Sequence, residues 1–363
     1  MTLFEETRIS SEAMREYEER GGALVDAVNR SMALSPHLRE YIGGNPLEVL
    51  YANHRHHHGV MVNVMKFNAW SMLDAIIPWV YRSYHAHGFS WSYFPAVYGA
   101  WSDALRSLLS PASAAELTAI YDTYAQGHDR YIAASSARTE HAPEFGEPFG
   151  GMGEKIIGLL ISGDASGVID LGAQYINDSR GLASFYLDAL TPAMVEIGLR
   201  WEAGRISVAH EHLASGVVNR VMSYWYHHVL DAKNTRGKAL VTSGPGEFHS
   251  IGGAMFSDLL TIDGWQTIHL GANTPISDLL TLADSFIPDI VAISVAMPFN
   301  IHAATEMVHA LRHRMTGHPC RIIVGGQAFN FMPSVWKETG ADHYSPTAPD
   351  GVATCEKYWN EIN

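Results

Sequence analysis

The segment that decides the fold is residues 238–252, KALVTSGPGEFHSIG, in which an apolar run leads into a glycine-rich loop and then into a helical pattern. Three more apolar runs follow it along the chain: QTIHLG (266–271), DIVAISVA (289–296) and RIIVGG (321–326). Runs that are apolar throughout are typical of strands buried on both faces. Their alternation with helical segments predicts a flavodoxin-like (Rossmann-type) doubly wound parallel sheet over residues 238–363.

Two helical regions precede the predicted sheet, so the fold class is α + α/β. Residues 154–232 contain four helical segments with short connections, which indicates a four-helix-bundle cap. Residues 1–134 carry helical periodicity with many aromatic and histidine residues and predict a separate helical domain. Between them, residues 135–153 (SSARTEHAPEFGEPFGGMG) have the composition of a linker.

Composition narrows the function classes. The net charge is -14 with 24 Lys and Arg among 363 residues, which argues against a nucleic-acid-binding surface. The N-terminus lacks the profile of a signal peptide, and the longest nearly uncharged stretch, residues 75–95, is broken by Pro78 and Arg82. Cys320 and Cys355 are isolated, which indicates neither a disulfide framework nor a zinc knuckle. We therefore expect a cytoplasmic protein without a nucleic-acid or membrane partner.

The loop after the first strand, Glu247-Phe248-His249-Ser250-Ile251-Gly252, falls at the carboxyl end of the sheet, where doubly wound folds bind ligands. It resembles the D/ExHxxG signature of cobalamin-binding domains, the family that includes the methionine synthase and mutase modules. The resemblance spans residues 238–363 and continues through Ser294, Gly325-Gly326 and Gly340-Ala341-Asp342. It implies a bound cobalamin with His249 as the lower ligand of the cobalt. It also implies that the cofactor is contacted by Glu247, Ser250, Gly252, Ser294, Gly325 and Gly326.

The residue types suit this chemistry. A neutral imidazole is a good metal ligand, and its strength depends on the group that its other ring nitrogen contacts. Glu247 can be that group, although the family often has the shorter Asp there. Glycines without Cβ atoms let a bulky ring pass close to the backbone; here they are Gly252, Gly253, Gly325 and Gly326. The alternative is an ordinary loop histidine beside ordinary turns.

The cap adds a second pattern, in which Trp201 is followed ten positions later by Glu211-His212. This is similar to the Trp-x9-Glu-His motif of CarH-type light-dependent regulators, whose bundle covers the upper face of adenosylcobalamin. The resemblance implies that Trp201 stacks near the adenosyl group, that Glu211 hydrogen-bonds it and that His212 supports the pocket. The alternative is a core tryptophan and a solvated carboxylate.

This chain departs from that family in two ways. Glu202 stands where those regulators carry the histidine that takes the upper cobalt position after photolysis, so a second histidine ligand would have to be His210 or His212. The MerR-type DNA-binding module is also missing, and the helical N-terminal region stands in its place.

The N-terminal region carries two features of its own. His54, His56, His57 and His58 predict either a zinc site or histidines within a core or pocket. The ten aromatic residues from Trp70 to Trp101 predict either a packed core or a pocket for a flat chromophore, with Arg55 and Arg82 facing its carboxylates. The whole arrangement resembles the photocobilins, which pair cobalamin with non-covalently bound biliverdin.

We therefore expect a light-responsive signalling protein rather than an enzyme. In this interpretation adenosylcobalamin lies between the cap and the α/β domain, photolysis changes the protein's conformation, and biliverdin is a second chromophore. The conformational change would be passed on to a separate effector protein. A homodimer is the possible oligomeric state. The alternative function is a corrinoid carrier for methyl transfer.

Overall fold

The computed structural model describes residues 4, 7–136, 143–229, 235–331 and 333–362. The chain forms two compact units. The first comprises Met1–Thr139 together with Glu202–Gly204, and the second comprises Glu140–Trp201 and Arg205–Asn363.

The described part of the N-terminal unit is helical. Its helices are α1 (Ser11–Glu19), α2 (Gly21–Ala33), α3 (Leu38–Ile42), α4 (Leu47–Lys66), α5 (Met72–Ala86), α6 (Tyr93–Leu108), α7 (Pro111–Gln126) and α8 (His128–Ser135). Glu16 of α1 accepts hydrogen bonds from the backbone and hydroxyl of Ser110, the residue that caps α7. This contact fixes the first helix against the seventh, 94 residues further along the chain.

The aromatic residues of this unit pack on one another. The rings of Tyr81 and Phe94 stack with centroids 3.6 Å apart, and Trp101 stacks on Tyr121 at 5.9 Å. The hydroxyl of Tyr98 donates to that of Tyr81 over 3.1 Å. The dense aromatic stretch of the sequence therefore supplies much of the helical core.

His54 and His57 of α4 also contact this interior, whereas His56 is exposed. Nδ1 of the buried His54 lies 2.6 Å from Oδ1 of Asn29, and His57 Nε2 lies 3.0 Å from the Tyr121 hydroxyl. Burial lowers the pKa of His54 to about 4 and that of His57 to about 3, so both rings are neutral. Among the described residues no group of His, Cys, Asp and Glu is arranged to hold a metal ion, so the zinc alternative finds no support.

The cap contains helices α9 (Gly153–Ser162), α10 (Ala165–Gly172), α11 (Ser179–Ser184), α12 (Thr191–Glu202) and α13 (Val208–Val229). Gly163 ends α9 in the left-handed conformation with φ 81°, as a glycine at that position predicts. A π-helical turn, Phe185–Leu190, joins α11 to α12 ahead of Pro192. Since proline has no N–H to donate, the wider turn accommodates it, and the Thr191 hydroxyl bonds the Tyr186 carbonyl at 2.8 Å.

One helical run of the cap, Ser179–Glu202, is long and apolar enough to cross a membrane by length and composition, with a mean hydropathy of 1.2. Leu182, Phe185, Leu190 and Ile197 within it are wholly buried in the core of the cap. The packing of the cap therefore accounts for the apolar character of this run.

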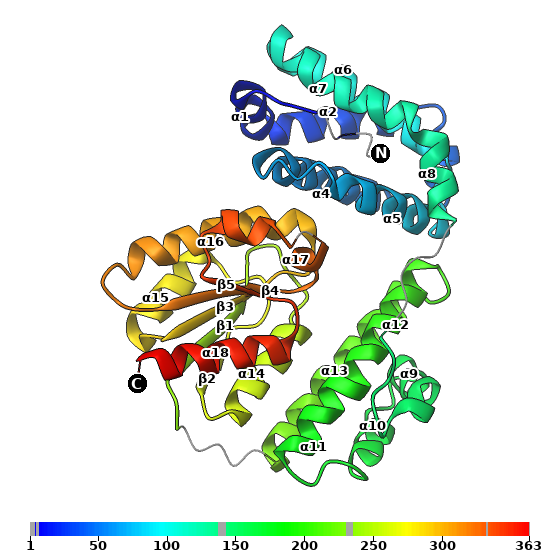
Figure 1. Cartoon of the computed structure of the whole chain (residues 1–363). Coiled ribbons are helices and arrows are strands. Elements are labelled where there is room, and N and C mark those ends of the chain that lie inside the picture. Colours follow the sequence, from blue (N-terminus) through cyan, green and yellow to red (C-terminus); the bar gives the residue numbers. More distant parts are fainter. Residues whose placement is uncertain (1–3, 5–6, 137–142, 230–234, 332, 363) are drawn as a thin grey trace. The chain divides into compact units, whose positions relative to one another are not determined.

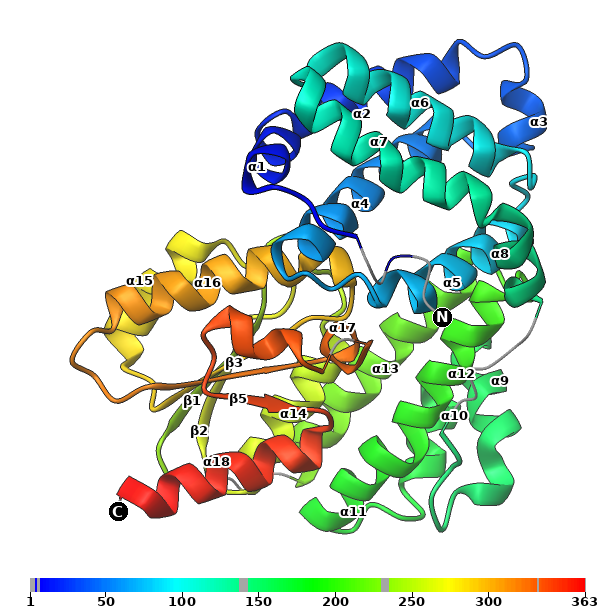
Figure 2. The same ribbon diagram turned by 45° about the horizontal axis from the view of Figure 1, so that its top comes forward.

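The C-terminal domain is a five-stranded parallel sheet in the order β2-β1-β3-β4-β5, which confirms the flavodoxin-like prediction. Its strands are β1 (Lys238–Ser243), β2 (Gln266–His269), β3 (Ile290–Ser294), β4 (Arg321–Gly325) and β5 (His343–Ser345). Helices α14 (Ile251–Ile262) and α18 (Ala348–Ile362) cover one face, and α15 (Ile276–Phe286) and α16 (Ile301–Arg314) cover the other (Figures 1 and 2).

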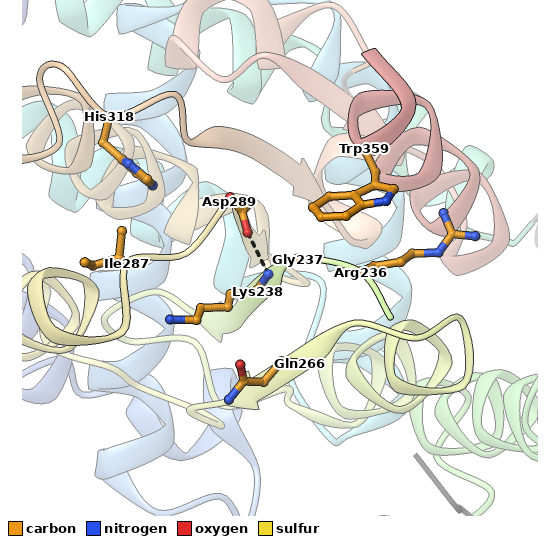
Figure 3. Close-up of a pocket in the computed structure, with 8 residues that line it drawn as sticks. All are labelled: Arg236, Gly237, Lys238, Gln266, Ile287, Asp289, His318 and Trp359. Carbon is orange, nitrogen blue, oxygen red and sulfur yellow. Dashed lines mark hydrogen bonds between the residues drawn. The ribbon is translucent and has the colours of Figure 1, made fainter. Parts of the chain in front are cut away.

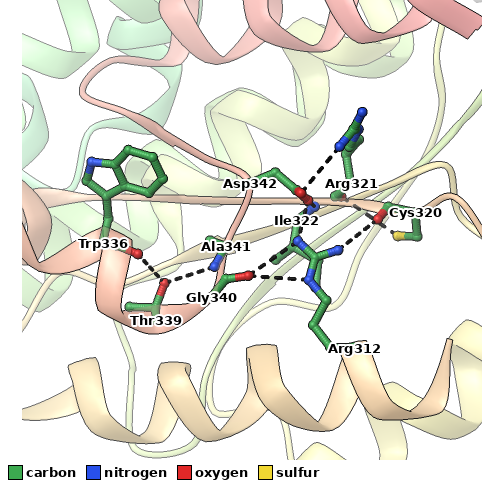
Figure 4. A network of polar contacts seen from close by, with 9 residues as sticks. All are labelled: Arg312, Cys320, Arg321, Ile322, Trp336, Thr339, Gly340, Ala341 and Asp342. Atoms are coloured by element: carbon green, nitrogen blue, oxygen red, sulfur yellow. Dashed lines mark hydrogen bonds and ion pairs between the residues drawn. The ribbon is translucent and has the colours of Figure 1, made fainter. Parts of the chain in front are cut away.

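A charged network holds the short strand β5 in place (Figure 4). Oδ2 of Asp342 accepts the backbone N–H of Ile322 at 2.7 Å and pairs with the guanidinium of Arg312 on α16. Arg312 also donates to the carbonyls of Cys320 and Gly340. Asp342, which the sequence marks only as a family landmark, therefore fixes the register of β5 beside β4.

The cap packs against α14 through a buried polar contact. The hydroxyl of Tyr186 donates to Oδ2 of Asp258 over 2.9 Å, and Met255 joins the core of the cap. Burial raises the pKa of Asp258 to about 6, although the hydrogen bond from Tyr186 opposes that rise. The carboxyl group therefore costs folding free energy when it is ionised.

This contact predicts a pH-dependent stability difference. An unfolded Asp ionises near pH 3.9, so the folded state binds more protons between about pH 4 and pH 6, and ΔG of unfolding falls as the pH rises through that range. Asp258→Asn should remove a cost of up to about 3 kcal/mol at pH 7. We expect its melting temperature to exceed that of the wild type at pH 7.5 and the gap to close near pH 4.5. The exposed Asp170→Asn is the control, and a pH-independent gap for Asp258→Asn would contradict the assignment.

Candidate functional site

The site is built on the loop between β1 and α14, where the carboxylate of Glu247 is wholly buried. Its Oε1 accepts two hydrogen bonds from His249, one from the backbone N–H at 3.1 Å and one from Nδ1 at 2.6 Å. Its Oε2 accepts the backbone N–H groups of Ala296 and Met297 at 2.9 and 3.0 Å and the side-chain amide of Asn300 at 3.1 Å. One carboxylate therefore joins the loop after β1 to the loop after β3.

These bonds set the charges of the pair. Burial alone would raise the pKa of Glu247, but the hydrogen bonds from His249, Met297 and Asn300 outweigh it and lower that pKa to about 2. The same bond raises the pKa of His249 against partial desolvation. Because Nδ1 of His249 donates to Glu247, its Nε2 carries the lone pair whenever the ring is neutral. The His249 side chain is 60% exposed, so this nitrogen can reach a metal.

Glu247 is longer than the Asp that is common at this position in the family, and the extra length lets it bond to two loops at once. It spans the distance between His249 on one loop and the backbone of Ala296 and Met297 on the other. Asn300, which the sequence analysis missed, bridges the same two loops by donating to the Gly246 carbonyl and to Glu247. Its only sequence signal is a polar residue shortly after a buried strand.

The cap residues of the predicted upper site lie on both sides of the turn between α12 and α13. Trp201 is half-buried in the last turn of α12, and Glu211 lies in the first turn of α13. The charge of Glu211 is the weakest of the influences that raise the pKa of His249, so the two side chains lie within electrostatic range of each other. His212 is 74% exposed, and its Nδ1 lies 2.7 Å from Glu211 Oε2, so it positions that carboxylate.

Glu202 and His210 have other partners. Glu202 is buried and pairs with Arg82 of α5 at 2.5 Å within the N-terminal unit. Arg82 is thus already paired with a buried carboxylate of the protein, which argues against its facing a chromophore carboxylate. His210 is exposed, and its Nδ1 lies 2.7 Å from the hydroxyl of Ser207.

A row of small and polar residues crosses the sheet at its carboxyl end. The strand pairing aligns Ser243 with Ser294, Ser294 with Gly325 and Gly325 with Ser345. Side chains of residues aligned in this way point to the same face of the sheet. Val241 and Ala292, two positions before Ser243 and Ser294 on their strands, point to that face too. Since both lie in the core formed with α14 and α18, it is the face that these two helices cover. His269 of β2 pairs with Val241 and belongs to this face too.

Several polar atoms on this face are buried without a hydrogen-bond partner among the described residues. They are Ser243 Oγ, Ser345 Oγ and His269 Nε2. Polar groups buried in this way are rare in folded proteins and require an explanation. A polar ligand that enters between the sheet and α14 would supply their partners, so this face fits the nucleotide tail of a cobalamin. The sequence analysis missed all three, because their shared face depends on the register.

The predicted glycines divide into two kinds. A Cβ on Gly252 would meet nothing within 4 Å, which leaves room beside the His249 loop. Gly326 instead has φ 98°, and a Cβ there would stand 2.4 Å from the carbonyl of Val295. A Cβ on Gly325 would stand 2.9 Å from the carbonyl of Ser345. Gly325 and Gly326 are therefore required by backbone packing, whatever they contact in a ligand.

Ser250 and Phe248 complete the loop. Ser250 precedes α14 and makes no capping bond with its side chain, so its hydroxyl is not committed to the helix. Phe248 is 72% exposed between the two polar residues of the motif. A large aromatic side chain that is exposed beside a ligand site suits contact with an apolar macrocycle.

A hollow at the opposite, amino end of the sheet is separate from this site (Figure 3). Its lining residues are Arg236, Gly237, Lys238, Gln266, Ile287, Asp289, His318 and Trp359. The charged groups are used internally: Lys238 Nζ donates to the Phe286 carbonyl, and Asp289 accepts the backbone N–H of Lys238. The residue types and the position argue against a cofactor site there.

Comparison with known families agrees with the geometry. Residues 237–352 match a family model described as the B12 binding domain, and residues 153–226 match a second model of the same description. The sheet domain and the cap of this chain are therefore cobalamin-binding domains. The matches correspond to the sheet domain and to the cap.

Curated relatives of the chain are corrinoid proteins. The dimethylamine corrinoid protein of Methanosarcina barkeri is 22% identical over 171 residues, which cover 46% of this chain and 79% of the relative. A corrinoid protein of Desulfitobacterium hafniense (strain Y51) is 20% identical over 203 residues, covering 54% and 93%. Trimethylamine corrinoid protein 1 of Methanosarcina acetivorans is 25% identical over 167 residues, covering 45% and 76%.

Solved structures with similarity to this chain are of the same kind. The monomethylamine corrinoid protein of Methanosarcina barkeri aligns with a TM-score of 0.49 at 17% identity, covering 56% of this chain and 96% of that one. A cobalamin-binding protein of Desulfitobacterium hafniense DCB-2 aligns with a TM-score of 0.33 at 20% identity, covering 57% and 98%.

The geometry of Glu247 predicts a structural cost for its neutral analogue. Glu247→Gln leaves one carbonyl oxygen where two carboxylate oxygens accept five hydrogen bonds, and its amide N–H groups face other donors. We expect a loss of about 2–3 kcal/mol in ΔG of unfolding of the cofactor-free protein, measured by urea denaturation. Gln174→Ala in the cap serves as the control. An unchanged urea midpoint would show that the carboxylate does not hold the two loops together.

Proposed function

We propose that this chain is a light-responsive cobalamin protein, with His249 below the corrin and the cap residues Trp201 and Glu211 above it. The observation that carries the proposal is the combined placement of His249 and Glu211. The imidazole is exposed at the carboxyl end of the sheet with Nδ1 held by Glu247, and the charge of the cap residue Glu211 is the weakest of the influences that raise the pKa of His249.

Each residue has a defined task in this proposal. Glu247 fixes the tautomer of His249 and directs its Nε2 toward the cobalt. The buried polar atoms of Ser243, His269 and Ser345 that have no hydrogen-bond partner among the described residues bind the nucleotide tail of the cobalamin. Glu211, oriented by His212 and Ser215, accepts hydrogen bonds from an adenosyl group. A bound adenosylcobalamin supplies a cobalt–carbon bond that visible light cleaves. When the adenosyl contacts of Trp201 and Glu211 are lost, the cap changes its preferred arrangement.

A corrinoid carrier for methyl transfer is the alternative, and the comparisons with known proteins support it better than they support light sensing. The names of the curated relatives support it, since they include dimethylamine and trimethylamine corrinoid proteins. The curated relatives align with this chain over 167 to 203 residues. Both candidate classes need a cap and a cobalamin domain, so the presence of these two domains does not distinguish them. The features that favour light sensing are the Trp201, Glu211, His212 pattern and the additional N-terminal helical unit.

Biliverdin as a second chromophore stays a prediction, supported only by the architecture. The N-terminal unit precedes both matched domains, and it contains many aromatic residues. Arg55, which is exposed on α4, is the remaining candidate for a propionate partner, since Arg82 pairs with Glu202. A red absorption band on mixing the protein with biliverdin is the expected signature. The effector protein and the absence of nucleic-acid and membrane partners likewise stay predictions.

The lower ligand is tested by His249→Ala. Without the imidazole the cobalt loses its protein ligand, so we expect weaker cobalamin binding by at least tenfold and a spectrum shifted to the base-off form. The measurement is an absorbance titration of the purified protein with hydroxocobalamin. His318→Ala, which alters a histidine at the amino end of the sheet, should bind like the wild type. An unchanged spectrum for His249→Ala would refute the ligand assignment.

The upper site separates the two candidate functions. We expect the wild-type protein loaded with adenosylcobalamin in the dark to change its absorption spectrum under green light. Glu211→Ala should reduce the affinity for adenosylcobalamin about tenfold and leave that for methylcobalamin unchanged, because only the adenosyl group bonds the carboxylate. Arg220→Ala, at an exposed position of the same helix α13, is the control. Equal losses for both cobalamins, or no stable photoproduct, would favour the methyl carrier.

A further inference from the structure

We infer that His269 recognises the base of the cobalamin's nucleotide tail through Nε2, and so selects cobamides whose lower base carries an aromatic ring nitrogen. This inference rests on the proposed binding of cobalamin with His249 below the cobalt. His269 lies outside the motif that identified the site, as the last residue of β2.

The position of His269 places its imidazole against the first turn of α14. Its Nε2 lies 3.3 Å from the point where a Cβ on Gly253 would stand, and Ser294 Cβ lies 3.8 Å from that same point. Val241 Cγ1 also lies 3.8 Å from it. A histidine, a serine and an apolar side chain therefore surround the Cβ position of Gly253 in the first turn of α14, where a methyl group would crowd Nε2 of His269.

The chemistry of His269 suits a nitrogen acceptor better than a charged group. Burial lowers the pKa of its ring, so the imidazole is neutral and carries a single N–H. Its Nε2 is buried and has no hydrogen-bond partner among the described residues. A neutral donor in a site walled by Val241 would bind a phosphate poorly, because that anion prefers cations or several donors.

The base of the tail provides the matching group. When His249 takes the lower position on cobalt, the benzimidazole nitrogen that would otherwise bind the metal becomes a free acceptor. Burying that acceptor without a donor is costly, and His269 Nε2–H can supply one. A phenolic lower base has no ring nitrogen and would gain nothing from this contact.

The test compares three ligands by absorbance and calorimetric titration of the full-length protein: cobalamin, a cobamide with a phenolic lower base, and cobinamide, which has no tail. We expect His269→Leu to bind cobalamin about tenfold more weakly than the wild type and to bind the other two ligands equally well. His269→Gln keeps an N–H donor and should recover most of the loss. The spectrum of bound cobalamin should stay that of the His249-ligated form in both variants.

The outcomes separate this inference from the proposed function. A parallel loss for all three ligands would show that His269 only supports the fold of the sheet, and an unchanged affinity for cobalamin would show that it does not touch the base. Either result overturns the inference while cobalamin binding stands. If the wild type binds none of the three ligands, the proposed function fails and the inference fails with it.

Discussion

The buried carboxylate of Glu247 is the interaction on which the site depends. In a sheet of order 2-1-3-4-5, the chain leaves β1 and β3 toward opposite sides, and the loops after these strands separate at that point. Glu247 closes the gap by accepting donors from both loops. Burying a carboxylate is costly, and here the five donated hydrogen bonds offset that cost. The direction of the His249 ring is therefore set by two strands of the sheet and not by one flexible loop.

The face of the sheet beneath α14 follows from a second constraint, the two-residue period of a strand. Deep in the domain this face carries Val241, Ala292 and Ile323, which pack against the helices. Two positions further along each strand, at the carboxyl end, the same face carries Ser243, Ser294 and Gly325. The change from branched apolar to small polar side chains marks where helix packing ends and a ligand can enter.

The sequence predicted the parts of the fold that depend on local patterns. The uniformly apolar runs gave the parallel strands, and Gly163 marked the end of α9. The motif pointed to Glu247 and His249, whose hydrogen bond follows from their spacing within one loop. Asn300 and His269 escaped detection because their roles arise from contacts with residues 53 and 16 positions away. Pairing across strands decides such contacts, and no periodicity within a segment reveals them.

Glu202 shows how far a motif can be carried from one family to another. The helix α12 ends at this residue, and the division into units falls between Trp201 and Glu202. A histidine there could turn toward a metal, whereas this glutamate is buried against Arg82, and Gly204 with φ 66° approaches the carbonyl of Ala86 closely. Withdrawing such a carboxylate from its cation would leave a buried negative charge uncompensated. The role of a metal-binding histidine at this motif position therefore does not carry over to this chain, in which the residue after Trp201 belongs by its contacts to the N-terminal unit.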